Sequence, residues 1–550
     1  MHKIDCGHLK VLALVVVALV ACGSALHAQT YTTLYSFGTN SGDPKNPQPN
    51  GLMSQGRDGN LYSTSPAGGS SNLGAAFTFT PAGALTKLLD LTASFGGLDL
   101  GFDGNFYGTT SIGGTSNVGT LFKMTPTGQL TTMWNFKITD GENPTYPPFQ
   151  GQDNNFYGSA PGGSLGFGVV YKMTPAGALT ALGNFDGTNG NGPNLPTQGT
   201  DGNFYGTARF GATHGFGCQI GCGTMYKLTS NGTITRLYSF GGWPNDGADP
   251  HGVLVQGSDG NFYGTTFSGG ANNFGSVFKI TRTGQTTILY SFCSQPGCVD
   301  GKTPWVGLVL GTDGNFYGTA QGGAHNAGAI FKITPAGVYT VLYSFCNVNA
   351  CADGFFPQTP LMQHTNGKFY GVTESGGANG LNGGVFYSLD IGLKPFVNLL
   401  NWTGKVGKTV EILGQGFNVA TKVSFNGVSA AFTISSDTYL TATVPAGATS
   451  GFVTVTLPGS TLKSNRKFLV APFILSFTPT SGPVGTPVTI TGTSFTGATK
   501  VTFGGVKATA FSVDNDSQIT ATVPTGAKTG KIQVTTPGGT ATSTQVFTVT

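Results

Sequence analysis

The segment Gly311–Gly323 reads GTDGNFYGTAQGG, and near copies of it recur along the chain. They are SDGNFYGTTFSGG at 258–270, TDGNFYGTARFGA at 200–212 and FDGNFYGTTSIGG at 102–114. A catalytic motif is needed once, whereas a structural unit is needed many times. The repetition therefore indicates an array of similar structural units.

The tyrosine of this segment recurs at spacings of 45 to 58 residues. A period of about this length is typical of four-stranded propeller blades. The mature chain shows no sustained 3.6-residue apolar period, which argues against helical repeats. Seven units are marked in this way, by Tyr62, Tyr107, Tyr157, Tyr205, Tyr263, Tyr317 and Tyr370.

The unit around Tyr317 predicts four strands joined by turns. Asp313-Gly314 is a two-residue hairpin signal, and Pro335-Ala336-Gly337 is a second tight turn. Four strands cannot bury their faces alone, but seven such sheets around an axis can. The predicted strands are 306–312, 315–320, 329–334 and 339–345.

The two ends of the array complement each other. The seventh unit has its third strand at 384–390 but lacks the LYSF strand that follows in other units. That strand occurs instead at 31–37, before the first unit. We therefore predict a seven-bladed β-propeller closed by its N-terminal strand, which leaves fewer exposed edges. The alternative is an open solenoid.

The repeat stops near residue 392, and a different duplication begins. GPVGTPVTITGTSF (482–495) echoes GKVGKTVEILGQGF (404–417), and ITATVPTGAKTG (519–530) echoes LTATVPAGATSG (440–451). Alternating apolar residues and Gly/Pro turns predict two small β-sandwiches. The fold class is therefore all-β. The predicted domains are a propeller at 29–391 and Ig-like domains at 392–471 and 472–550, after a signal peptide at 1–28.

The N-terminal segment predicts export. Residues 9–20 form an apolar run that is too short to span a bilayer and suits a signal peptide. Two processing routes are open. An ordinary signal peptidase would cleave after Ala28, whereas the lipobox-like sequence that ends at Cys22 would lead to lipidation of Cys22. The mature chain contains no further segment apolar enough to cross a membrane, so we expect a secreted or cell-surface protein.

The charge content argues against a nucleic-acid partner. Only 9% of residues are charged and the formal net charge is +4, whereas nucleic-acid binding needs a dense basic patch.

Cysteine usage agrees with export. Short local spacings in an exported chain predict disulfides. Zinc is the alternative, but no loop offers the further ligands that zinc needs. The predicted pairs are Cys218/Cys222, Cys293/Cys298 and Cys346/Cys351.

One face of the propeller should carry long loops, namely the loops between strands 2 and 3 and the connections between blades. The connections share an Asp-Gly-x-x-Pro pattern, which is either part of a binding face or repeated turn chemistry. Aromatic rings with carboxylates suit a glycan or peptide ligand. The candidate ligand-binding residues are Trp243, Asp246, His251, Asp300, Trp305, Asp353 and Phe355.

No cofactor or metal is predicted. Each Asp-Gly-Asn turn supplies one carboxylate, and its spacing does not match an EF-hand calcium loop. Histidines such as His251 and His325 could reach one face, but no motif links them to a catalytic base. We therefore expect a protein that is not an enzyme.

Two resemblances agree with these predictions. The pattern DGNFYGTT…GG…FKITPxG…LYSF over 31–391 resembles the Gloeo/Verruco tandem repeats of exported bacterial proteins. Residues 393–471 and 472–550 resemble the IPT/TIG family of Ig-like domains, although LLNWTGKVG (399–407) replaces the usual Pro-x-x-Gly-Pro opening in the first copy. That family implies spacers, dimer contacts or adhesion stalks.

The function hypotheses fall into three classes. The first is a non-enzymatic surface or secreted protein whose propeller binds a glycan or peptide on an Ig-like stalk, in an adhesion or scaffold role. The second is a streptogramin-lyase-like or polysaccharide-active propeller enzyme, because the blade pattern also resembles that of streptogramin lyases. The third is a purely structural surface component.

Overall fold

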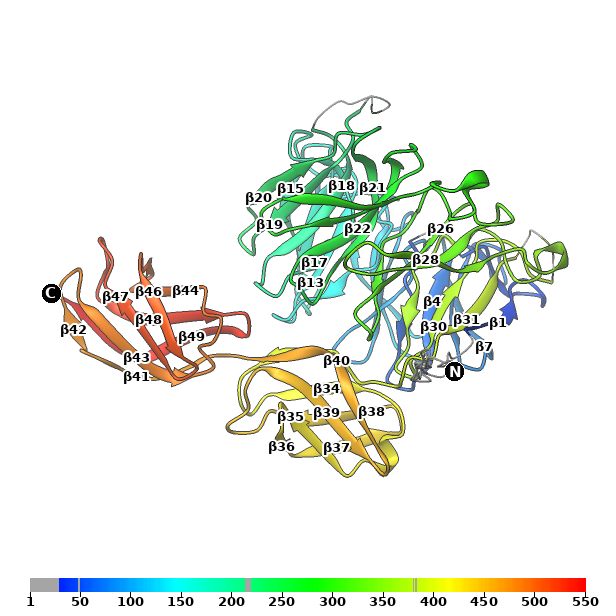
Figure 1. Cartoon of the computed structure of the whole chain (residues 1–550). Coiled ribbons are helices and arrows are strands. Elements are labelled where there is room, and N and C mark those ends of the chain that lie inside the picture. The colour runs from blue at the N-terminus through cyan, green and yellow to red at the C-terminus, as the bar shows by residue number, and fades with distance from the viewer. Residues whose placement is uncertain (1–28, 48–49, 213–217, 219, 379, 381–382) are drawn as a thin grey trace, which may run out of the picture.

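The computed structural model describes residues 29–47, 50–212, 218, 220–378, 380 and 383–550. The predicted signal peptide, with Cys22, lies outside the described residues. The chain forms seven antiparallel sheets around one axis, followed by two β-sandwiches (Figure 1).

Each sheet of the ring is one propeller blade built from consecutive strands, and strand 1 lies innermost. The fourth blade carries an extra strand, β16, beside β18. The first three blades are, in order, β3 (Ser54–Gln55), β4 (Leu61–Ser65), β6 (Ala75–Phe79) and β7 (Leu85–Asp90); β8 (Asp99–Leu100), β9 (Phe106–Thr110), β10 (Thr120–Met124) and β11 (Leu130–Asn135); and β12 (Phe149–Gln150), β13 (Phe156–Ala160), β14 (Val169–Met173) and β15 (Leu179–Asn184). The fourth and fifth blades are β16 (Asn191–Pro193), β17 (Thr197–Gln198), β18 (Phe204–Phe210), β19 (Thr224–Leu228) and β20 (Ile234–Ser239); and β21 (Gly247–Gln256), β22 (Phe262–Gly269), β23 (Ser276–Ile280) and β24 (Thr286–Ser291). The sixth and seventh blades are β25 (Val309–Leu310), β26 (Phe316–Ala320), β27 (Ala329–Ile333) and β28 (Tyr339–Ser344); and β29 (Met362–Gln363), β30 (Phe369–Val372), β31 (Val385–Asp390) and β1 (Thr30–Ser36).

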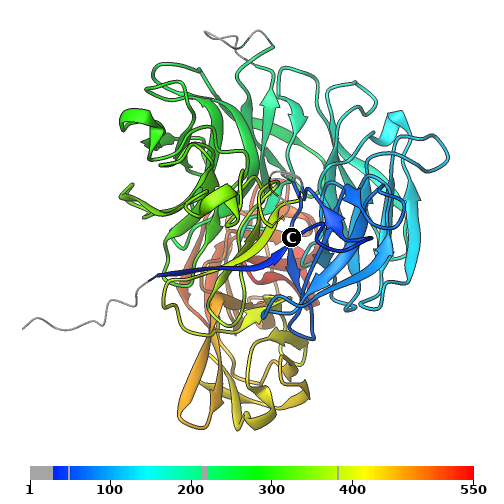
Figure 2. The same cartoon turned by 90° about the vertical axis from the view of Figure 1, so that its right-hand side faces the viewer.

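The ring is closed by the N-terminal strand, as predicted. β1 pairs antiparallel with β31, with Tyr31 opposite Leu389, and completes the seventh blade (Figure 2). The Tyr31 ring also stacks on Tyr343 of the sixth blade, with centroids 3.9 Å apart. The predicted seven-bladed, strand-closed propeller is therefore confirmed, and the open solenoid is wrong.

The Phe-Tyr pair of the repeat holds neighbouring blades together. In each blade the tyrosine of strand 2 packs against the phenylalanine of strand 2 in the next blade, with ring centroids 4.0 to 4.3 Å apart at six interfaces. At the seventh interface Tyr370 packs in one cluster with Leu61. Buried aromatic pairs contribute packing energy beyond the area that they bury. The dipeptide is repeated because every interface needs both halves of this contact.

The glycine after the Phe-Tyr pair leaves room for an aromatic ring on strand 3. A Cβ on Gly108 would lie 2.5 Å from the Phe122 ring, and one on Gly318 would lie 2.6 Å from Phe331. Such distances require a neighbour to move, so the position accepts glycine for steric reasons. The sequence Phe-Tyr-Gly thus encodes one contact to each neighbouring blade and one within the blade.

The Asp-Gly-Asn turns are closed by the aspartate itself. Asp313 Oδ2 accepts hydrogen bonds from the Asn315 amide at 2.7 Å and from the Tyr317 hydroxyl at 2.7 Å. The same aspartate–tyrosine bond recurs in the first six blades. These carboxylates are committed to the turns, which accounts for the motif without calcium.

A glutamine at the end of the innermost strand links most pairs of neighbouring blades. Its side-chain carbonyl accepts a hydrogen bond from a backbone N–H of the preceding blade, as Gln256 does from Thr200 at 3.0 Å. The same bond is made by Gln55, Gln150, Gln198 and Gln363. These bonds give a hydrogen-bond partner to backbone donors that follow the innermost strands.

Two β-sandwiches follow the propeller, and each has its own apolar core. Their strand orders match, including one parallel pair in each. The sheets of the first are β32 (Asn398–Leu399), β34 (Thr409–Leu413), β38 (Tyr439–Thr443) and β37 (Phe432–Ser436), against β33 (Thr403–Gly404), β40 (Ser460–Val470), β39 (Gly451–Leu457), β35 (Lys422–Phe425) and β36 (Val428–Ala430). The sheets of the second are β41 (Phe473–Thr478), β43 (Pro487–Thr493), β47 (Gln518–Thr522) and β46 (Phe511–Asn515), against β42 (Ser481–Gly482), β49 (Gly539–Val549), β48 (Gly530–Thr536), β44 (Lys500–Phe503) and β45 (Val506–Lys507).

Short elements complete the fold. A two-stranded ribbon joins the loops on either side of β3 and β4, and single 3-10 turns occur in the loops. These elements are β2 (Pro44–Lys45), β5 (Ala67–Gly68), η1 (Ile138–Asp140), η2 (Pro296–Cys298), η3 (Asn349–Cys351) and η4 (Phe417–Val419).

The turn aspartates predict a loss of stability in acid. Burial opposes ionisation of Asp103, Asp153, Asp201 and Asp259, but hydrogen bonds from the nearby asparagine and tyrosine outweigh it and lower the pKa of each carboxyl. For Asp259 the pKa falls to about 2. A lowered folded-state pKa adds stability above the unfolded value of about 3.9, and that stability is lost as the pH falls through the folded value.

We therefore expect the free energy of unfolding to be level near neutral pH and to fall between about pH 4 and pH 2. Urea unfolding of the full chain at several pH values measures this dependence. The double variant Asp103→Asn, Asp153→Asn should show a shallower acid loss than wild type, and Asp516→Asn in the second sandwich serves as the control. An acid loss that is equal in all three proteins would contradict the assignment.

Candidate functional site

The two faces of the propeller differ in their connections. The face formed by the loops between strands 2 and 3 and by the connections between blades is called the loop face. The opposite face, formed by the Asp-Gly-Asn turns and the turns between strands 3 and 4, is called the turn face. Six of the seven residues predicted to bind a ligand belong to loop-face connections, and His251 lies within β21.

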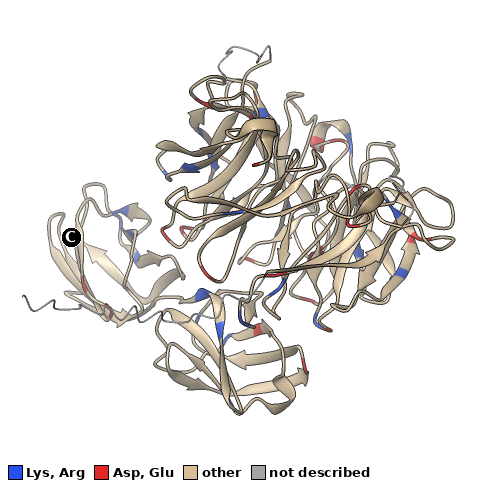
Figure 3. Cartoon of the chain, turned by 45° about the vertical axis from the view of Figure 1, so that its right-hand side comes forward, with Lys and Arg blue, Asp and Glu red and all other residues tan. Residues whose placement is uncertain are grey.

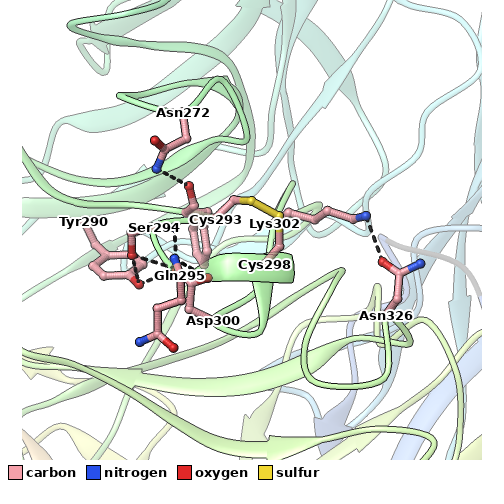
Figure 4. The surroundings of a disulfide bond; sticks show 10 residues. Asn272, Tyr290, Cys293, Ser294, Gln295, Cys298, Asp300, Lys302 and Asn326 are labelled. Carbon is pink, nitrogen blue, oxygen red and sulfur yellow. Dashed lines mark hydrogen bonds between the residues drawn. A yellow bond between two sulfur atoms is a disulfide. The ribbon is translucent and has the colours of Figure 1, made fainter.

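The three predicted carboxylates hold the connections between blades. Asp300 Oδ2 accepts hydrogen bonds from the Tyr290 hydroxyl at 2.5 Å and from the Ser294 N–H at 2.8 Å (Figure 4). Asp246 and Asp353 make the same bonds to the strand-4 tyrosine and to a backbone N–H of their own connection. Asp300 and Asp353 are buried. The Asp-Gly-x-x-Pro pattern is therefore turn chemistry, in which the carboxylate shapes the loop.

Three disulfides stiffen the same loops. Cys218–Cys222 lies between β18 and β19, whereas Cys293–Cys298 and Cys346–Cys351 lie in connections between blades (Figure 4 shows Cys293–Cys298). The predicted disulfides are confirmed. Each closes a very short loop, so it limits local motion more than it stabilises the whole fold.

His251 and Trp305 pack against each other beneath the loops. Their ring centroids are 5.0 Å apart, and His251 Nε2 lies 3.1 Å from Asp249 Oδ2. The other carboxylate oxygen, Asp249 Oδ1, pairs with Arg209 Nε at 2.9 Å. His251 is buried, and this burial lowers the pKa of its imidazole, with the nearby Arg209 charge acting in the same direction. The ring is thus neutral near pH 7 and fills space next to Trp305.

Trp243 and Phe355 are more accessible. The indole of Trp243 is 40% exposed, and its Nε1 donates a hydrogen bond to the Ala271 carbonyl at 3.2 Å. Phe355 is half-buried against Phe356 and bonds through its backbone N–H to the Ser375 carbonyl. Of the predicted residues, Trp243 therefore offers the largest open aromatic surface.

The structure adds a set of exposed apolar residues on the loop face. Twelve large apolar side chains of the described propeller residues are exposed, and ten of them lie in loop-face connections. Apart from Trp243, these residues were not predicted from the sequence, because single apolar residues in glycine-rich loops carry no pattern of their own. The ten are Leu73, Ile112, Ile138, Leu165, Phe167, Ile220, Trp243, Phe274, Val299 and Val348.

The loop face and the rest of the surface carry little charge. Charged residues are sparse and scattered over the molecule (Figure 3). Within the described residues no three His, Cys, Asp or Glu side chains come together in a way that could hold a metal ion. The described part of the chain also contains no helix of the length and hydropathy that crossing a bilayer requires.

The first sandwich docks on part of the turn face. Arg57 in the first Asp-Gly turn pairs with Glu411 of β34 at 2.6 Å, and its guanidinium lies 4.6 Å from the centroid of the Tyr439 ring. Leu413 of the same strand packs into an apolar cluster of the first two blades. Gln152 Oε1 accepts a hydrogen bond from the Trp402 N–H at 2.9 Å. The first sandwich is thus docked on the propeller, while the second lies apart from it (Figure 1).

Two protein-family models match the chain. The Gloeobacter/Verrucomicrobia repeat matches residues 90–220 and 216–434, which is more than half of the chain, and an IPT/TIG domain matches residues 472–549. The chain belongs to the Gloeobacter/Verrucomicrobia repeat family. In this family member the repeat match continues past the last blade into the docked sandwich. No curated protein matches the chain.

Solved structures similar to this Gloeobacter/Verrucomicrobia repeat protein are distant. A fungal alcohol oxidase of the AA5 family shares 14% identity over 80% of this chain and 99% of its own, with a TM-score of 0.43. A gluconolactonase from Xanthomonas campestris shares 13% identity over 66% and 90%, with a TM-score of 0.34. SGBP-B from a complex xyloglucan utilization locus in Bacteroides uniformis shares 22% identity, with a TM-score of 0.15 over 28% of this chain and 48% of that chain, so the match spans about half of that relative.

The docked arrangement predicts that the first sandwich can be released by substitution. We expect the double variant Glu411→Thr, Leu413→Thr to lose about 3 kcal/mol of docking free energy, because it removes a partly buried ion pair and an apolar contact. Small-angle scattering should then report a larger radius of gyration. Val406→Thr with Val419→Thr, both exposed on the same sandwich, is the matched control. A radius of gyration unchanged from wild type would argue against a docked state held by this interface.

Proposed function

We propose that the protein is an exported, non-enzymatic binding protein whose loop face binds an extracellular glycan. The single observation that carries this proposal is the concentration of exposed apolar side chains on that face, ten of the twelve in the propeller. Exposed apolar groups that gather on one face of a soluble protein often mark a binding surface. Three disulfides support an extracellular location, because such bonds persist in oxidising compartments.

A glycan suits the loop face better than a charged peptide. The loop carboxylates already accept hydrogen bonds from their own loops, so few charges remain to pair with a peptide. Trp243 and Phe274 present partly open rings from neighbouring connections, since the Trp243 indole bonds to Ala271 in the loop that contains Phe274. Flat rings of this kind can stack on the apolar face of a sugar. The disulfides and the buried carboxylates keep the surrounding loops in one conformation, which lowers the entropic cost of binding.

Ligand binding by the loop face can be tested with a glycan array and the full mature chain. For a glycan found on the array, we expect Trp243→Ala and Phe274→Ala each to weaken binding by about tenfold or more, because interface energy is concentrated in a few aromatic residues. Val338→Ala is the matched control, since Val338 is 63% exposed but lies in a turn-face turn.

Three outcomes would count against the proposal. Silence across glycans would favour a purely structural surface component. Binding only to peptides would replace the ligand class. Binding that the Val338 variant weakens as much as the Trp243 variant would move the site away from the loop face.

A further inference from the structure

The docked sandwich does not fill the axial opening of the propeller, and a chamber remains beneath it. Two adjoining cavities of 330 Å³ and 270 Å³ share Asp99, Leu100, Asn398 and Leu400 in their linings. The innermost strands of the blades form one wall, and β32 and β40 with their flanking residues form the other. Volumes of this order are usual for small-molecule sites, which occur preferentially between domains.

Two charged side chains from opposite walls line the larger cavity. Asp99 comes from the innermost strand of the second blade, and Arg466 comes from β40 of the sandwich. The Arg466 surface is accessible, yet the surrounding protein desolvates its guanidinium and lowers its pKa. Among the ion pairs of the described residues, none includes Arg466. Arg466 is solvent-accessible and lines the cavity, so its guanidinium can reach an anionic ligand there.

The duplicated sandwich shows that the fold does not need this arginine. Ser464 Oγ donates a hydrogen bond to the Arg466 carbonyl at 2.6 Å, and Ser543 Oγ donates the same bond to the Gln545 carbonyl at 2.6 Å. The two positions are therefore equivalent, and only the side chain differs. Gln545 belongs to the sandwich that does not cover the propeller. The arginine is therefore present in the sandwich that lines the chamber and absent from the equivalent position of the other sandwich.

Aromatic side chains complete the lining of the larger cavity. Phe149 lies on the propeller wall and Trp402 on the sandwich wall, where the Arg466 guanidinium is 5.5 Å from the Trp402 ring centroid. Arginine pairs with carboxylates through two parallel hydrogen bonds. A carboxylate such as Asp99 can accept hydrogen bonds from hydroxyl groups. The cavity therefore offers a cation for an anionic group, an aromatic surface for an apolar face and an acceptor for a hydroxyl group. A sugar acid is a ligand that carries all three of these features.

We propose that this chamber binds a small sugar acid, such as a uronic acid, with its carboxylate on Arg466. The Phe149 ring borders the sugar, Trp402 supports the Arg466 guanidinium from the sandwich core, and Asp99 accepts a hydrogen bond from a ring hydroxyl. This site is on the opposite face from the loop-face glycan site, so the two proposals stand or fall separately.

Calorimetric titration of the full mature chain with D-galacturonate tests the chamber, with neutral D-galactose as the paired probe. We expect galacturonate to bind and galactose to bind at least tenfold more weakly. Arg466→Gln, which installs the residue that the second sandwich carries at the same place, should weaken galacturonate binding at least tenfold. Lys463→Gln removes a positive charge from the same strand outside the chamber lining and should leave binding unchanged.

Five results of these titrations would contradict the proposed site. No binding of galacturonate, or equal binding of galactose, overturns the assignment of a sugar-acid site. Equal losses in the Arg466 and Lys463 variants would show general attraction between charges. Acetate that binds as tightly as galacturonate would show that the sugar ring is not recognised. The loop-face variant Trp243→Ala should keep wild-type galacturonate affinity, and a loss there would place the ligand on the other face.

Discussion

Each blade of this propeller is too small to bury its own faces, so the fold depends on contacts between neighbouring sheets. The tyrosine of one blade meets the phenylalanine of the next at six interfaces, and the glycine beside them admits a third ring. Because every blade needs a neighbour on both sides, the array is stable only when it closes on itself. The N-terminal strand supplies that closure by pairing with β31. The rigidity of the loop face and the shape of the axial chamber both follow from the closed ring.

Features that repeat along the chain could be predicted from the sequence, because each copy reports the same local constraint. The seven recurring tyrosines gave the number of blades, and the missing fourth strand of the last unit indicated that the N-terminal strand closes the ring. The short spacings between cysteines predicted the disulfides. Features that depend on contacts between distant segments could not be predicted. Arg57 and Glu411 are 354 residues apart, and neither belongs to a recognisable motif. The buried state of Asp300 was also not readable, since a loop carboxylate looks the same in sequence whether it faces a ligand or its own backbone. The exposed apolar residues of the loop face and the Arg466 position likewise became visible only in three dimensions.

The two sandwiches show how one fold takes on two roles through a few surface residues. Leu413 and Tyr439 contact the propeller in the first copy, whereas the equivalent positions in the second copy are Thr491 and Gln518. The unusual LLNWTGKVG opening has the same origin, because Leu400 and Trp402 face the propeller and the backbone of Trp402 bonds to Gln152. The cores of both copies remain apolar throughout. Differences at these surface positions accompany the docking of the first copy on the propeller.

The pairing of β1 with β31 also has a consequence for how the molecule is made. The first strand of the ring is synthesised roughly 350 residues before its partner, and the entropic cost of bringing such distant segments together must be met before the ring can form. Until then TYTTLYS (30–36) is an unpaired, hydrogen-bonding edge, the kind of segment that joins other chains. A helper that shields this edge until β31 is available would therefore favour the monomeric ring over intermolecular exchange of the strand.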